Sequence, residues 1–142
     1  MMLHADSFPG PRAFARHCLR QGFAWQPQTG LMFKHGFGEC IVFREACWQI
    51  EIVCMPPGLA VPSHRHLRVS SADLRLAAFD SLAVVGGHAY SNEQRGSLAA
   101  NLLLIPRGVW HEGSSGTSGA MFLSFQQWEG EPGYLGEDWE AA

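Results

Sequence analysis

The chain has 142 residues, of which 46% are hydrophobic and 16% are charged, and its formal net charge is -3. This composition predicts one compact domain with a buried core and argues against a disordered chain. The absence of a basic block argues against nucleic-acid binding, and no apolar stretch is long enough to span a bilayer.

A short N-terminal helix is predicted over Ser7 to Gly22. Pro11 suits the first turn of this helix, and the glycine at its end stops it. Phe14, Cys18 and Leu19 recur with the helical period and share one face. The helix is therefore expected to be amphipathic.

Short strands are predicted after this helix, because the helical period disappears and apolar or alternating runs follow. Turn residues separate these runs, which is typical of an all-β sandwich or barrel. The predicted strands are Leu31 to Lys34, Cys40 to Phe43, Trp48 to Met55, Leu74 to Phe79, Leu82 to Val85, Asn101 to Ile105 and Ala120 to Phe125.

The last segment, residues 129–142, contains five acidic residues and neither Lys nor Arg. A solvated acidic tail is one interpretation. Tyr134, Leu135 and Trp139 leave open a second, in which the segment packs along the barrel or against another subunit. Apolar and aromatic residues at both chain ends lead us to expect a homodimer.

Two histidines separated by one residue, His64 and His66, form the first candidate site. Side chains alternate between faces in an extended chain, so both imidazoles leave the same face. Neutral ring nitrogens are good ligands for transition metals. An HxH pair alone is also common on protein surfaces, so this pair needs a third ligand to indicate a metal site.

A second segment supplies that ligand. The apolar run before Pro106 ends at a Pro-x-Gly turn, and the chain returns with Trp110 and His111. Gly108 can adopt the positive φ that such a turn requires. This reversal places His111 at the rim or in the interior of a barrel.

The two segments together resemble the two motifs of the cupin superfamily, and the resemblance covers residues 48–125. Its first motif is a glycine, five residues and HxH, and its second contains P-x-G-x-x-H. Six residues match: Gly58, His64, His66, Pro106, Gly108 and His111. The resemblance implies an RmlC-like, single-domain cupin β-barrel, which is a jelly roll or double-stranded β-helix. It also implies that His64, His66 and His111 bind a divalent metal ion such as Zn, Fe, Ni or Mn.

The first motif departs from the family at its glutamate, which usually follows the second histidine by four or five residues. Ser70 and Ser71 occupy those positions here, and Asp73 comes two residues later. A lengthened loop would let Asp73 begin the next strand, with its carboxylate on the interior side together with Arg75. Asp73 is therefore a candidate metal ligand, and a partner of the ligands or a solvent-facing group are the alternatives.

Three kinds of function are left open, and the sequence does not decide whether the protein is an enzyme. The first is a metal-dependent enzyme of dioxygenase or isomerase type that acts on a small organic or sugar-like substrate. The second is a non-catalytic cupin that binds or senses a small molecule, and the third is a structural role in which the acidic aromatic tail and the barrel face form an oligomer. The expected partners are a small-molecule ligand and a second copy of the chain, with neither nucleic acid nor a membrane.

The expected organisation is one cupin domain over residues 1–142, with residues 1–22 as a helical extension and residues 129–142 as an acidic aromatic tail. Residues 1–11 lack the basic and apolar regions of a secretory signal. The four cysteines have no CxxC spacing and lie in apolar segments, so reduced thiols are expected. Both features favour a cytoplasmic protein.

Overall fold

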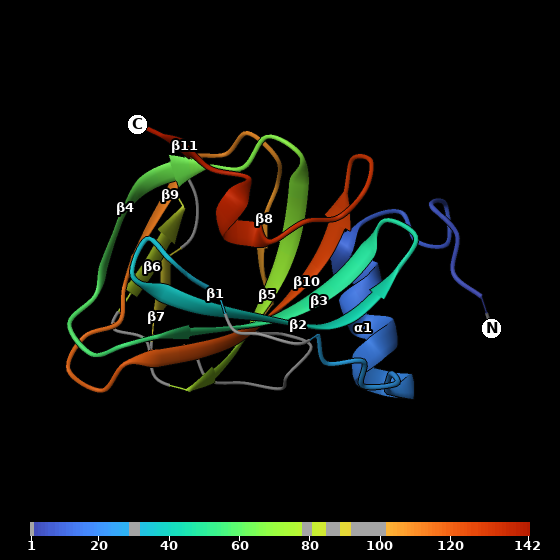
Figure 1. The fold of residues 1–142 in the computed structure, drawn as a ribbon, viewed down its shortest axis with the longest axis horizontal. Helices are drawn as coiled ribbons and strands as arrows, with labels where there is room; N and C mark the ends of the chain where they lie inside the picture. Colours follow the sequence, from blue (N-terminus) through green and yellow to red (C-terminus); the bar gives the residue numbers. More distant parts are fainter. Residues whose placement is uncertain (1, 29–31, 78–80, 85–88, 92–101) are drawn as a thin grey trace.

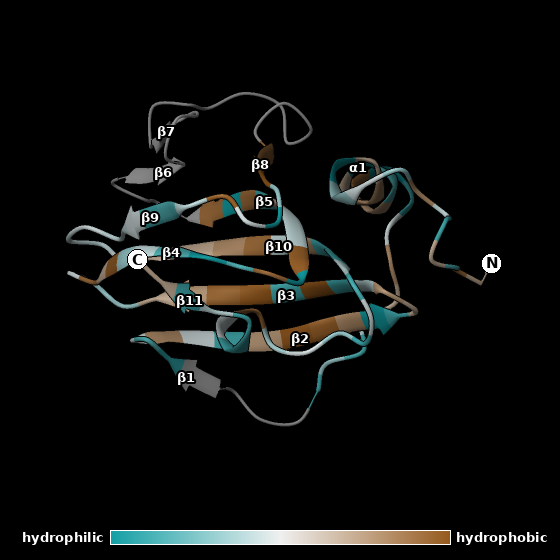
Figure 2. Cartoon of the chain, turned by 90° about the horizontal axis from the view of Figure 1, so that it is seen from above, coloured by the Kyte–Doolittle hydropathy of each residue, from teal (hydrophilic) through white to brown (hydrophobic). Residues whose placement is uncertain are grey.

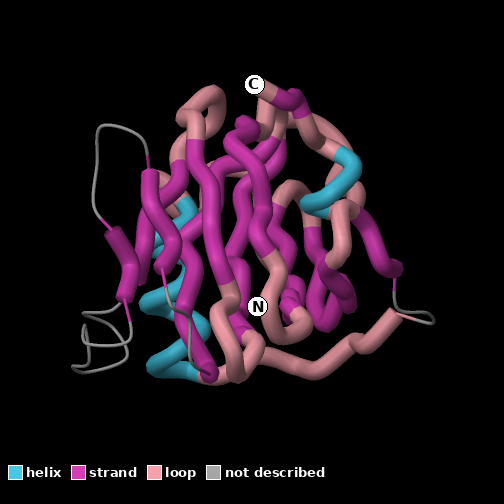
Figure 3. The backbone as a smooth tube through the Cα atoms, turned by 90° about the vertical axis from the view of Figure 1, so that its left-hand side faces the viewer, coloured by secondary structure: helices cyan, strands magenta, loops and turns pink. Residues whose placement is uncertain are grey.

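Two antiparallel β-sheets lie face to face, and one helix covers the outer side of the larger sheet (Figure 1). The computed structural model describes residues 2–28, 32–77, 81–84, 89–91 and 102–142. Figure 3 shows the strands enclosing a barrel, with the C-terminus at one of its ends. Among the described residues, no helix has the length and apolar character needed to cross a membrane.

The larger sheet has six strands in the order β1-β2-β3-β10-β5-β8. These strands are β1 (Met32–Lys34), β2 (Phe37–Glu45), β3 (Trp48–Met55), β10 (Ala120–Trp128), β5 (Val69–Ala77) and β8 (Leu102–Ile105). The smaller sheet has five, in the order β11-β4-β9-β6-β7. They are β11 (Glu140–Ala141), β4 (Ala60–Arg65), β9 (His111–Ser114), β6 (Ser81–Val84) and β7 (Ala89–Ser91). The chain crosses repeatedly between the sheets, as in the expected jelly roll.

The N-terminal helix, α1 (Pro11–Gln21), begins four residues later than predicted. Gly10 before it is fully extended, with φ of -177°. The ring of Pro11 disfavours helical geometry in the preceding residue, so the helix cannot start earlier. At the other end Gly22 has φ of 76° and donates its N–H to the Cys18 carbonyl, as predicted for the helix stop.

Both faces of the larger sheet are buried, which explains the imperfect alternation along β3. Ile50 and Phe125 pack against α1 on the outer face, whereas Val53 and Phe122 belong to the barrel core. Figure 2 shows hydrophobic and hydrophilic residues following one another along β3. Phe122 and Phe125 therefore lie on opposite faces of β10.

The strand that carries Asp73 begins earlier than predicted. β5 starts at Val69, so Asp73 lies inside the strand and no lengthened loop separates it from His66. The Asp138 carboxylate accepts the backbone N–H groups of Arg68 (2.7 Å) and Val69 (3.0 Å), which stabilises an immediate chain reversal. The predicted strand residues Leu31, Ala78, Phe79, Val85 and Asn101 lie outside the described residues.

Candidate metal centre

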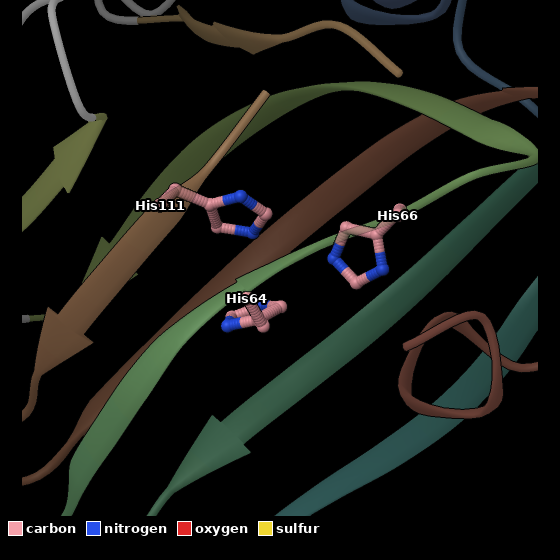
Figure 4. Close-up of side chains that lie close together, drawn as sticks. All are labelled: His64, His66 and His111. Carbon is pink, nitrogen blue, oxygen red and sulfur yellow. The ribbon is translucent and has the colours of Figure 1, made fainter. Parts of the chain in front are cut away.

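The three motif histidines come together where β4 and β9 pair. His64 lies in β4 directly opposite His111, the first residue of β9, and His66 follows the end of β4. The Gly108 N–H donates to the His66 carbonyl (2.7 Å), which ties the second motif to the first. Gly108 has φ of 78°, the left-handed conformation predicted for this turn. Figure 4 shows the three imidazoles gathered around one space.

The hydrogen bonds of the three rings determine which nitrogen carries the proton. Nδ1 of each histidine lies within hydrogen-bond distance of a main-chain carbonyl oxygen. The acceptors are Pro62 for His64 (2.8 Å), Asp138 for His66, and Val109 for His111 (3.0 Å). A carbonyl oxygen can only accept, so each Nδ1 donates and each Nε2 keeps a free lone pair. This is the tautomer in which Nε2 can bind a metal ion.

Burial keeps these rings neutral at physiological pH. Together with a smaller contribution from the neighbouring histidines, it lowers the pKa of His64 to about 3 and that of His111 to about 4. Burial also lowers the pKa of His66. All three side chains are therefore neutral imidazoles at physiological pH.

The spacing of the three side chains suits a single ion. One potential ligand atom from each of His64, His66 and His111 lies within 4.8 Å of the other two. Nitrogens that share one ion at about 2.1 Å lie up to about 4.2 Å apart, which is close to this spacing. The donor set, tautomers and charge state thus fit a divalent transition-metal ion.

The same histidines line a cavity of about 50 Å³ together with Ser71 and Asp73 of β5. The Asp73 side chain is 4% exposed. Burial raises its pKa to about 7, although hydrogen bonds from the Ser124 and Ser71 side chains lower it. Its Oδ1 has no hydrogen-bond partner among the described residues. Asp73 thus faces the interior, as expected, but lies outside the close group of three histidines.

Solved structures with this architecture were found, although no protein-family model and no curated protein sequence matches the chain. A cupin-2 domain protein from Rhodospirillum rubrum has a TM-score of 0.56 at 14% identity, covering 84% of this chain and 73% of that one. A cupin 2 conserved barrel domain protein from Rhodopseudomonas palustris has a TM-score of 0.53 at 18% identity, covering 78% and 75%. The chain has the cupin fold. A structure described as that of DMSP lyases also resembles this chain, with a TM-score of 0.55, 12% identity and coverage of 93% and 69%.

Two aromatic neighbours of the histidines could not be identified from the sequence. Trp139 stacks on the His64 ring with centroids 3.6 Å apart, and His35 stacks on the other side of Trp139 at 3.7 Å. His35 carries no motif, and Trp139 was noted only as part of an acidic aromatic tail. The tail therefore packs along the barrel, which was the second of the two interpretations.

Arg65 and Arg107, which lie in the two motif segments, form ion pairs at the surface of the barrel. Arg65 pairs with Glu140 at 3.1 Å and lies over the Trp110 ring at 4.7 Å. Arg107 forms an ion pair with Glu129. Both arginine side chains are partly exposed, in contrast to the buried histidines on either side of Arg65.

Proposed function

We propose that the protein is a metal-binding cupin that holds one divalent transition-metal ion through His64, His66 and His111. The observation that carries this proposal is the set of three buried, neutral imidazoles whose Nε2 lone pairs are left free by carbonyl partners. Zinc, iron, nickel and manganese suit such a site. A bound ion would supply Lewis-acid polarisation of a ligand oxygen.

We further propose that this cupin is an enzyme that moves a proton on a small organic substrate, as an isomerase does. Asp73 supports this, since it lines the cavity together with the histidines and its Oδ1 has no hydrogen-bond partner among the described residues. A pKa of about 7 suits an acid or base that works near neutral pH. The DMSP lyases among the similar structures support an enzyme of this fold.

Ligand binding without turnover is the second candidate. It is supported by Ser71, which lines the cavity at a position where the family motif usually has a metal-binding glutamate. Exchange of deuterium from solvent into candidate organic acids and sugars, catalysed by the metal-loaded protein, would separate the two functions. Exchange that depends on Asp73 supports the enzyme, and binding without exchange supports the alternative.

The metal site is tested directly with protein purified without an affinity tag. We expect elemental analysis after dialysis against Zn²⁺ to find about one ion per chain in the wild type. His66→Ala should lose most of this metal, because it removes a buried ligand and its fixed Nε2.

His4→Ala is the matched control, since His4 is exposed and contacts other residues through its backbone. It should leave the occupancy unchanged. A wild-type chain that takes up no ion, or a His66→Ala variant with full occupancy, would contradict the proposed site.

A further inference from the structure

The C-terminal segment, residues 129–142, lies across one end of the barrel beside the candidate metal centre; we call it the C-terminal strap. Its last strand, β11, pairs with β4 so that Ala141 lies opposite His64 (Figure 1). Leu135 lines the same cavity as the three histidines. The strap is therefore a wall of the site and not a solvated tail.

Trp139 of the strap fixes the plane of one ligand. Its ring is nearly parallel to the His64 ring, with an angle of 6° between them, and His35 stacks on its opposite face at 12°. A ring held in such a stack cannot rotate about its Cβ–Cγ bond without losing the contact. Trp139 thus limits the direction in which the His64 Nε2 points.

Asp138 of the strap determines the tautomer of a second ligand. Its carbonyl accepts the proton on Nδ1 of His66. The carboxylate of the same residue is held by the N–H groups of Arg68 and Val69, so the carbonyl has a fixed position. The strap thus directs the His66 Nε2 toward the cavity.

Contacts with the body of the barrel hold the strap in place independently of the histidines. The Leu135 N–H donates to the buried Glu51 carboxylate (2.8 Å), and the Gly136 N–H donates to the buried Glu39 carboxylate. Arg65 forms two hydrogen bonds with Glu140, each at 3.1 Å. These contacts anchor the strap to the barrel without using the three histidines.

We propose that the C-terminal strap is a positioning element of the metal centre, in which Trp139 orients His64 and Asp138 orients His66. This inference rests on the proposed metal site. Groups that orient metal ligands typically change metal affinity by about ten- to a hundredfold when removed. The strap should therefore raise the affinity of a site whose three ligands all lie outside it.

The first test separates ring stacking from simple packing. Trp139→Leu keeps an apolar side chain but cannot stack, and we expect it to weaken Zn²⁺ binding by about ten- to a hundredfold. It should also shift the visible d–d absorption bands of the Co²⁺-loaded protein, which report ligand geometry. Trp139→Phe retains a stacking ring and should restore both properties. The control is Trp25→Ala, because Trp25 is 58% exposed and lies away from the cavity.

The second test addresses Asp138 with a pair of variants. Asp138→Ala removes the acceptor for the Arg68 and Val69 N–H groups and should weaken Zn²⁺ binding. Asp138→Asn keeps an acceptor oxygen, so this variant should bind Zn²⁺ more tightly than Asp138→Ala does. Thermal unfolding of the metal-free variants verifies that each is folded. Unchanged affinity and Co²⁺ spectra in Trp139→Leu and Asp138→Ala would overturn this inference alone. A wild-type protein that binds no Zn²⁺ would overturn both it and the proposed metal site.

Discussion

At the scale of single residues, the ability of each histidine to bind a metal depends on the hydrogen-bond partner of its Nδ1 as well as on the histidine itself. Two of the carbonyl partners, Pro62 and Val109, each lie two residues before the histidine that they bind. The third, Asp138, lies 72 residues after His66. Local geometry therefore orients His64 and His111, whereas the orientation of His66 depends on a carbonyl of the C-terminal strap.

Asp73 allows a prediction at the same scale. Because it lies outside the close group of ligand atoms, Asp73→Asn should weaken Zn²⁺ binding by no more than about ten- to a hundredfold and leave one ion per chain. Competition with a chromophoric chelator measures this affinity. Glu112→Gln is the control, since Glu112 is an exposed carboxylate on β9. A loss of binding as large as that in His66→Ala would show that Asp73 is a direct ligand.

At the scale of elements, a buried polar network joins three strands of the larger sheet to the strap. Arg44 of β2 donates to Gln49 of β3 (2.5 Å), which donates to Gln126 of β10 (3.0 Å) and to the Gly133 carbonyl (2.6 Å). Gln126 in turn donates to the Glu51 carboxylate (2.8 Å). Buried polar groups are stable only when they are paired, so this network specifies where the strap returns to the barrel.

Glu51 makes the stability of this network depend on pH. Burial raises the pKa of its carboxyl, and the neighbouring Glu39 raises it further. A carboxyl whose pKa is raised by folding stabilises the folded state most when it is protonated in both states. For Glu51 this contribution is complete below the unfolded pKa of about 4.5 and is lost as the pH rises through the folded pKa of about 8. The metal-free wild type should therefore lose this contribution between those pH values.

Glu51→Gln removes the titration but keeps an acceptor for the Leu135 N–H. The free energy of unfolding of the variant, relative to wild type, should rise by on the order of 2 kcal/mol between pH 5 and pH 8. Denaturant unfolding of the metal-free proteins at several pH values measures this difference. The exposed Glu112→Gln should follow the wild type, and parallel curves for Glu51→Gln and wild type would show that Glu51 is not titrating in this range.

At the scale of the whole molecule, the position of the strap removes one of the two reasons for expecting a homodimer, which was the aromatic residues near the C-terminus. Trp128 and Trp139 pack within the chain, so they are not free to join two copies. Large apolar side chains remain exposed elsewhere: Met2, Trp25, Leu67, Leu76 and Met121. A dimer would bury part of this surface.

We expect sedimentation equilibrium of the wild type at micromolar concentrations to give about twice the mass of one chain. Leu76 is an exposed residue near the end of β5. If β5 takes part in the dimer interface, Leu76→Glu should raise the dissociation constant of the dimer. The His4→Ala chain should sediment like the wild type. A single species of monomer mass from 1 to about 100 µM would contradict the prediction.

The sequence alone determined the features that follow from local geometry. Alternation along an extended chain placed His64 and His66 on one face, and the Pro-x-Gly turn returned His111 to the same region. The Trp48–Met55 strand was predicted with its observed bounds, because its ends are marked by neighbouring turns. These are properties of a few consecutive residues, and they are encoded in spacing and residue type.

Only the tertiary structure decided which distant residues complete the site. His35 and Trp139 are far apart in the sequence and meet because β1, β2 and the strap pack around the same end of the barrel. The early start of β5, and with it the place of Asp73, depends on the Asp138 carboxylate, which lies 70 residues after Arg68 and 69 after Val69. Contacts of this kind arise when closure of the barrel offsets the entropy of long loops, and no local period records them.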